Sequence, residues 1–220
     1  MSVFTRREII EQIKTGGLSF EPGLDGFQLQ PHAIDLRLGY TFYVAKTWEI
    51  TQKGRTALTV DYLNNITSKN YFELIQLNPG QYFEILPREY IIASTLESVH
   101  LKRLNTMGVL YPRSSFNRRG LSVDLSGIID TGYQGTLMIP IQNNTNNQTI
   151  KLYPGERICQ MTLQSLNSEL TPEEADLHGM HRAKYIGSDP NALSAKPDRE
   201  EEKKYIIEGR IEELKKNYHL

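Results

Sequence analysis

The chain has 220 residues, of which 39% are apolar and 23% charged, and this balance is that of an ordinary folded globular protein. The formal net charge of −1 gives no overall attraction to nucleic acid or to an anionic membrane, so neither is expected as a partner. A single cysteine excludes an intramolecular disulfide, and because no signal-peptide pattern or bilayer-length apolar run is visible, we expect a cytoplasmic protein.

The first predicted element is an N-terminal helix within residues 1–17. Residues 5–15 carry three isoleucines at helical spacing, Thr5 can cap the first turn, and Gly16-Gly17 can end the helix.

A β-rich domain is predicted from residue 18 to residue 167. Short runs rich in Val, Ile, Leu, Tyr and Phe alternate there with Gly, Pro and Asn, which is typical of a barrel or jelly roll. The polar segment 142–148 is expected to be an exposed hairpin loop. The predicted strands are residues 33–44, 72–77, 82–87, 90–95, 106–112, 136–142, 149–154 and 158–166.

The β pattern stops after residue 167. Residues 168–197 contain three prolines and are expected to be irregular, whereas residues 198–220 are expected to form a C-terminal helix. Gly209 within that helix costs about 1 kcal/mol relative to Ala. The predicted fold is therefore an all-β, distorted barrel or jelly roll with an N-terminal helix and a C-terminal helical tail.

The first candidate site is a basic, hydroxyl-rich loop at the end of an apolar strand. Guanidinium and hydroxyl groups are the donors that a polyphosphate needs. A solvated basic loop explains the same pattern equally well. The candidate phosphate ligands are Arg113, Ser114, Ser115 and Arg118.

A second candidate site lies where an apolar strand ends in a Thr-Gly turn. An ionised Asp130 at a strand end can take a proton from water or orient a sugar hydroxyl. Tyr133 can lay its ring against a base or a sugar. Considered alone, Asp130 is better explained as a turn cap.

Two further polar residues interrupt strands. Asp35 breaks an apolar alternation and can hold a hydrated Mg²⁺ beside phosphates, or else form an ion pair with an arginine. Gln160 follows a Pro-Gly turn, and its amide can bind a phosphate, a base or a neighbouring backbone group.

Four segments in this order resemble the motifs of the trimeric dUTPase and dCTP deaminase superfamily. They are PHAIDLRLG (31–39), PRSSFNR (112–118), GIIDTGYQG (127–135) and PGERICQM (154–161). The resemblance implies a distorted β-barrel, a homotrimer, and active sites built at subunit interfaces. It also implies that residues 168–197 close over the nucleotide.

The resemblance points to both branches of the superfamily. The N-terminal helix, the RSSFNR segment and AKYIG (183–187) resemble the deaminases, whereas the hairpin and the fourth motif resemble the dUTPases. Deaminases of this zinc-free type carry a proton-shuttling Glu where this chain has Pro140, and no Asp or Glu occurs from Thr131 to Tyr153. Losing such a group typically costs about 10²–10⁴ in rate.

Pro140 therefore favours dUTP diphosphatase, which hydrolyses dUTP to dUMP and pyrophosphate. A dCTP deaminase, or a bifunctional enzyme making dUMP from dCTP, is the alternative. A trimer that binds nucleotides without turnover is a further alternative.

The resemblance also assigns roles to individual residues. Asp130 and Arg118 are the expected catalytic residues, and Mg²⁺ is the expected cofactor, held through water by Asp35. Tyr133 is expected to pack on the deoxyribose, and the hairpin near Gly135, Leu137 and Met138 to read the base. The remaining expected ligands of the substrate are Arg113, Ser114, Ser115, Gln160, Lys184 and Tyr185.

Overall fold

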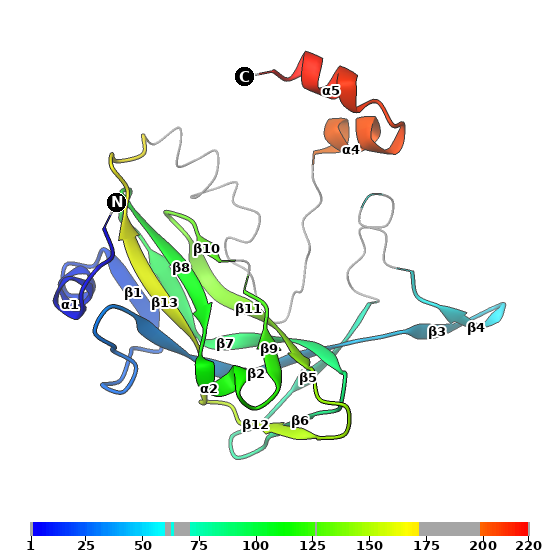
Figure 1. Cartoon of the computed structure of the whole chain (residues 1–220), viewed down its shortest axis with the longest axis horizontal. Helices are drawn as coiled ribbons and strands as arrows, with labels where there is room; N and C mark the ends of the chain where they lie inside the picture. The colour runs from blue at the N-terminus through cyan, green and yellow to red at the C-terminus, as the bar shows by residue number, and fades with distance from the viewer. Residues whose placement is uncertain (1, 60–62, 64–70, 126, 172–198, 220) are drawn as a thin grey trace. The chain divides into compact units, whose positions relative to one another are not determined.

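The computed structural model of the chain describes residues 2–59, 63, 71–125, 127–171 and 199–219 (Figure 1). The chain divides into two compact units. One comprises Met1–Ala45 and Glu73–Ala192, and the other comprises Lys46–Phe72 and Leu193–Leu220. The predicted division into four consecutive parts stays a prediction.

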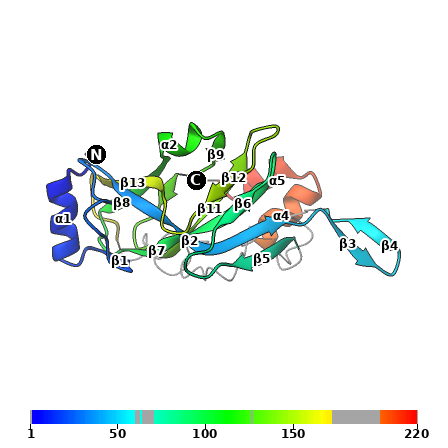
Figure 2. The same cartoon turned by 90° about the horizontal axis from the view of Figure 1, so that it is seen from below.

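The predicted N-terminal helix is confirmed as α1 (Arg6–Lys14). The backbone N–H of Thr5 donates to the carboxylate of Glu8 at 2.7 Å, which satisfies a donor at the start of the helix. These hydrogen bonds from Thr5 lower the pKa of Glu8. Gly16, in the left-handed region at φ +76°, follows the C-terminal end, and the buried Ile9 anchors α1 in the core beside β1 (Figure 2).

A nine-stranded antiparallel sheet forms the first unit. Its order is β10-β8-β13-β2-β7-β11-β9, with β1 pairing to β7 and β5 to β2. The strands are β1 (Leu18–Glu21), β2 (Ile34–Ala45), β5 (Phe72–Gln76), β7 (Tyr90–Leu101), β8 (Thr106–Pro112), β9 (Leu121–Val123), β10 (Ile128–Ile129), β11 (Gln134–Asn143) and β13 (Arg157–Ser165).

A separate two-stranded sheet pairs β6 (Phe83–Ile85) with β12 (Ile150–Leu152). Each of the eight predicted apolar runs contains a strand, so the all-β prediction is confirmed. The hairpin predicted at 142–148 is wrong, because this loop leads from β11 to β12, which pairs with β6 in the other sheet.

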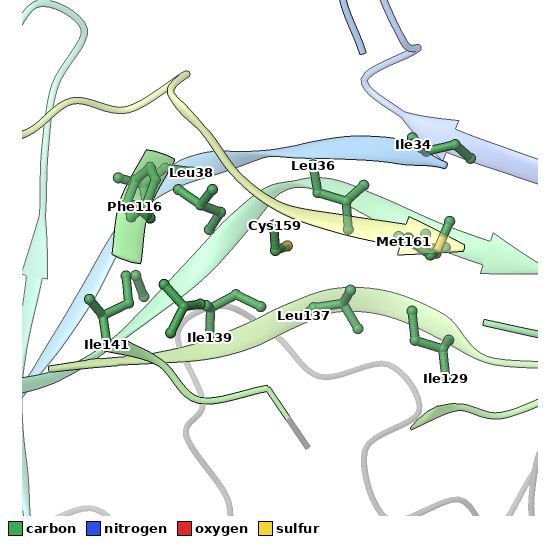
Figure 3. Packing of buried hydrophobic residues seen from close by; sticks show 14 of the residues in the cluster. Ile34, Leu36, Leu38, Phe116, Ile129, Leu137, Ile139, Ile141, Cys159 and Met161 are labelled. Atoms are coloured by element: carbon green, nitrogen blue, oxygen red, sulfur yellow. The ribbon is translucent and has the colours of Figure 1, made fainter. Parts of the chain in front are cut away.

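The core lies between two parts of the sheet that curl to face each other. Figure 3 shows Ile139 and Ile141 of β11 pointing toward Leu36 and Leu38 of β2, and all four are buried. Alternation along each strand sends every second side chain into this core and its neighbours outward. Phe116, from the short helix after β8, is also buried in this cluster.

The second unit contains a hairpin, β3 (Trp48–Thr51) with β4 (Gly54–Ala57), and two short helices, α4 (Glu200–Ile207) and α5 (Ile211–Asn217). The single helix predicted at 198–220 is therefore wrong. Gly209 adopts φ +69°, a left-handed conformation that ends α4, and a new helix starts two residues later. Among the described residues, no helix is long and apolar enough to cross a membrane.

Candidate active site

Strand β8 places two of the predicted motifs at its opposite ends. Its last residue, Pro112, leads through Arg113 into α2 (Ser114–Asn117). Its first residues pair with β10, where Ile129 lies opposite Gly108. Because the two strands run antiparallel, Asp130 continues toward Met107, away from Arg113.

The loop around α2 keeps its apolar side chain inside and its hydroxyl and basic groups outside. Phe116 is 1% exposed, whereas the predicted phosphate ligands Ser114, Ser115 and Arg118 are exposed. Arg119 lies over the ring of Phe116 at 4.1 Å and forms an ion pair with Glu156 at 2.8 Å. The burial of Phe116 therefore fixes the loop, and its exposed donors remain accessible to a ligand.

Asp35 lies at the centre of a buried polar cluster, which we call the Asp35 cluster. Its Oδ1 accepts from Nε2 of Gln160 at 2.9 Å. Its Oδ2 accepts from Nη1 of Arg157 at 3.0 Å and Nε2 of Gln30 at 3.3 Å, and lies 3.4 Å from Nε of Arg113. The side chain of Asp35 is 0% exposed, so these donors replace water around its charge.

The Asp35 cluster brings together three residues for which the sequence predicts ligand roles. The carboxylate of Asp35 is surrounded by two guanidinium groups and two amides, a donor set that does not fit a hydrated Mg²⁺. The side chains of Arg113 and Gln160, predicted to bind phosphate, point to Asp35 instead. In the part of the chain that the structure describes, no three His, Cys, Asp or Glu residues are grouped to hold a metal ion.

Arg157 of β13, which the sequence did not suggest as a site residue, contacts Asp35 of β2. Its Nη1 also donates to the carbonyl oxygen of Phe27 at 2.7 Å. An arginine next to a Pro-Gly turn gives no sign of its partner, because the partner Asp35 lies 122 positions away in the sequence. Only the pairing of β13 with β2 brings the two together.

The segment after β10 forms the predicted tight turn. The backbone N–H of Tyr133 donates to the carbonyl oxygen of Asp130 at 3.1 Å, and Gly132 adopts φ +82° within the turn. The hydroxyl of Thr131 donates to the carbonyl oxygen of Thr106 at 2.8 Å and fixes the turn to β8. The side chain of Asp130 is exposed beyond this fixed turn, as a water-activating group requires.

Tyr133 and the start of β11 are more buried than their predicted roles require. Tyr133 is 8% exposed, and its hydroxyl donates to the carbonyl oxygen of Thr136 at 3.0 Å, so little of the ring can contact a sugar. The strand is irregular at Leu137, whose backbone N–H donates to the hydroxyl of Thr95 at 3.0 Å. That N–H is therefore already used, whereas the half-buried Met138 lies on the outward face of β11.

Pro140 has an acidic neighbour that sequence reasoning missed. The backbone N–H of Asp124 donates to the carbonyl oxygen of Pro140 at 3.1 Å, one residue beyond the end of β9. Asp124 is exposed and borders an open hollow of about 450 Å³ between the α2 loop and β9. The hollow is lined by Pro112, Asn117, Gly120, Leu121, Ser122, Val123, Asp124 and Asn144.

Glu97 and Cys159 are buried ionisable residues with no predicted role in the site. Burial raises the pKa of Glu97, whose carboxylate accepts from Nε2 of Gln28 at 2.7 Å and from the backbone N–H of Arg37 at 2.9 Å. Burial also raises the pKa of the Cys159 thiol, so this cysteine is not a thiolate nucleophile at neutral pH. The predicted ligands Lys184 and Tyr185 lie outside the described residues.

Comparison with known proteins gives consistent results. Residues 3–166 match a family model described as dCTP deaminase-like. A dUMP-forming dCTP deaminase of Methanosphaera stadtmanae is 29% identical over 201 residues, which cover 90% of this chain and 96% of that protein. One of Persephonella marina is 31% identical over 186 residues, covering 84% and 92%.

Among solved structures, the 2′-deoxycytidine 5′-triphosphate deaminase of Agrobacterium tumefaciens has a similar fold. Its TM-score is 0.55 at 22% identity, and the match covers 80% of this chain and 50% of that chain. The structural similarity therefore supports the curled β fold described above.

Proposed function

Because the chain belongs to the dCTP deaminase-like family, we propose that it converts dCTP to dUMP, with release of ammonia and pyrophosphate. The observation that carries this proposal is the similarity to dUMP-forming dCTP deaminases over nearly the whole length of both chains. The sequence alone favours hydrolysis of dUTP, with a dCTP deaminase or a bifunctional enzyme as the second reading. The names of the relatives favour the second.

The exposed donors of the α2 loop support binding of the triphosphate. Ser114, Ser115 and Arg118 present two hydroxyls and a guanidinium group within five residues, and none of them is buried. Arg113 is assigned a positioning role, because its guanidinium lies against Asp35 while its backbone precedes α2. The charged oxygens of the triphosphate would accept charge-assisted hydrogen bonds from this loop.

Asp130 is the proposed base for the hydrolytic step. Its ionised carboxylate takes a proton from a water molecule, whose oxygen then attacks the α-phosphorus. The bond from the α-phosphorus to the bridging oxygen breaks, and pyrophosphate leaves. The turn fixed by Thr131 and Thr106 holds Asp130 in place, and such positioning supplies much of the rate in phosphoryl transfer.

The separation of the two motifs along β8 supports a site shared between copies of the chain. Asp130 lies beside Met107, and Arg113 follows six residues later, so the two are about 20 Å apart along the strand at 3.3 Å per residue. A reacting water must lie within about 3.5 Å of the phosphorus that it attacks. The Asp130 turn of one copy and the α2 loop of another would meet in the predicted homotrimer.

Binding of Mg²⁺ remains a proposal, and we assign it no protein ligand. The Asp35 cluster does not fit it, and the oxygens of a bound triphosphate are ligands of the kind that Mg²⁺ prefers.

Hydrolysis of dUTP alone is the second candidate, and Pro140 is the observation that favours it. A proline side chain cannot donate or accept a proton, so deamination needs another group.

The two candidates differ in one product. We would incubate the purified protein separately with dCTP and dUTP and measure ammonia, pyrophosphate and dUMP. Our proposal predicts dUMP from both substrates and ammonia from dCTP. Formation of dUMP from dUTP without ammonia from dCTP would show that hydrolysis of dUTP is the only activity. Binding without any product would indicate a non-catalytic trimer.

A further inference from the structure

We propose that the carboxylate of Asp124 transfers the proton in the deamination step, from a position directly across the sheet from Pro140. The inference rests on the proposed conversion of dCTP to dUMP, and it assigns a catalytic residue for the half of the reaction that Pro140 leaves without one.

The pairing of β9 with β11 places Asp124 and Pro140 opposite each other. Val123, the last residue of β9, pairs with Ile141. The next pair outward is Asp124 with Pro140, joined by the 3.1 Å hydrogen bond from the backbone N–H of Asp124. Directly opposed residues in an antiparallel pair point to the same face, with Cβ atoms about 4.5–5.5 Å apart. A carboxylate on Asp124 therefore starts about 5 Å from the Cβ of Pro140.

The face that the pair shares is the outward one. Val123 and Ile141 are buried in the core, so their neighbours in the sheet, Asp124 and Pro140, point away from it. Met138 lies on the same outward face, two residues before Pro140 and about 7 Å away along the strand. A base read by the backbone near Met138 would thus have Asp124 within reach of its far edge.

Proline at position 140 also limits how firmly Asp124 is held to β11. Proline has no N–H, so the reciprocal hydrogen bond from residue 140 to the carbonyl oxygen of Asp124 cannot form. Strand β9 ends at Val123, one residue earlier. Pro140 thus leaves this pair with one backbone hydrogen bond in place of two, and the outward direction of the Asp124 side chain leaves it exposed.

The space beside Asp124 is open to solvent. The hollow of about 450 Å³ shares Asp124, Val123 and Pro112 with a second open hollow, so a ligand bound on the outward face can approach the carboxylate. Asn117, the last residue of α2, also borders this hollow within the same chain.

The proposed step balances with one water molecule. The carboxylate of Asp124 accepts a proton from water as its oxygen bonds to C4 of cytosine. The same proton then passes to the exocyclic nitrogen, the bond from C4 to that nitrogen breaks, and ammonia leaves with the carboxylate restored. The second proton of the water passes from the new C4 hydroxyl to N3, which gives the keto form of uracil. The products are dUTP and ammonia, and dUTP then enters the hydrolytic step at Asp130.

The test replaces Asp124 by asparagine and measures two activities. Asp124→Asn keeps the shape of the side chain, so the fold and triphosphate binding should be unchanged. Ammonia release from dCTP should fall by about 10²–10⁴, the usual cost of losing a general acid–base group. Formation of dUMP from dUTP should not change. The matched control is Glu73→Gln, which neutralises an exposed carboxylate on β5 and should alter neither activity.

A rescue variant makes the assignment sharper. Pro140→Glu in the Asp124→Asn background puts a carboxylate on the opposite member of the same pair, and it should restore part of the ammonia release.

Three results would count against the inference. If the wild-type protein releases no ammonia from dCTP, the proposed function and this assignment both fail. If the wild-type protein and Asp124→Asn release ammonia equally fast, the assignment alone fails. Equal loss of both activities in Asp124→Asn would show a role in binding rather than in proton transfer.

Discussion

Asp35 and Asp124 are carboxylates of the same curled sheet in opposite surroundings. Asp35 lies inside β2, is fully buried, and accepts from two glutamine amides and one arginine with a second arginine nearby. Asp124 lies one residue past the end of β9, where the sheet pairing stops and a hollow opens. The comparison teaches that a motif carboxylate surrounded by donors stabilises the fold, whereas a carboxylate at a strand end has the access that chemistry requires.

The largest effect on activity is expected at Asp130, which, like Asp124, follows the end of a strand. Asp130→Asn should slow formation of dUMP from dUTP by about 10²–10⁴, because the amide cannot take a proton from water. Rates under saturating dUTP measure this, with Glu73→Gln as the control. An Asp130→Asn protein with wild-type turnover would show that exposure at a strand end does not mark the hydrolytic base.

Substitution of the buried Asp35 is expected to lower the stability of the fold. Asp35→Asn should lower the free energy of unfolding by about 1.5–3 kcal/mol, because charged hydrogen bonds to the partly exposed Arg157 and Arg113 are lost. Urea denaturation followed by circular dichroism measures this change. Asp124→Asn is the comparison variant and should change it by no more than about 0.5 kcal/mol. Equal unfolding curves for the two variants would remove the distinction between the two carboxylates.

The same contrast between an exposed and a partly buried side chain is expected for Arg118 and Arg113 of the α2 loop. Arg118→Ala should raise the KM for the triphosphate through loss of a charged hydrogen bond worth about 1.5–3 kcal/mol, with no change in unfolding. Arg113→Ala should mainly lower the free energy of unfolding, because Arg113 partners Asp35. Steady-state kinetics and denaturation of both variants test this pair. Reversal of the two phenotypes would mean that the predicted ligand set from the sequence was correct for Arg113.

The smallest expected effect is a pH dependence from Glu97. Burial raises its pKa above the ordinary 4.5, so the folded protein binds the proton more tightly than the unfolded chain. The free energy of unfolding should therefore fall as the pH rises from about 4.5 to the raised value in the folded state, and Glu97→Gln should remove that slope. Denaturation at a series of pH values measures it. An unchanged slope in Glu97→Gln would assign the dependence to other groups.

Local sequence patterns were sufficient to predict most of the secondary structure. Strand alternation and turn residues located the eight apolar runs, and the isoleucine spacing located α1. The patterns could not predict that 142–148 joins two different sheets, because strand pairing depends on contacts between distant segments. Gly209 was noted as unfavourable in a helix, but its left-handed conformation depends on how the chain turns there.

The candidate site was harder to predict, for a related reason. The sequence identified the exposed donors of the α2 loop and Asp130, because these residues sit beside their own turns. It could not show that Arg113 and Gln160 contact Asp35, because that partner is far away along the chain. Asp124 could not be found from the sequence, because only the pairing of β9 with β11 brings it beside Pro140.

The separation of the Asp130 turn from the α2 loop along β8 predicts that defective copies of the chain can complement each other. Because each chain would supply one half of a site to a neighbour, two impaired variants can complement each other. Asp130→Asn lacks the turn function and Arg118→Ala lacks the loop function, so a mixed assembly restores sites that combine an intact turn with an intact loop. Random mixing in equal amounts gives such pairs at about one quarter of the interfaces. Two defective alleles in one cell would then sustain dUMP production that neither sustains alone.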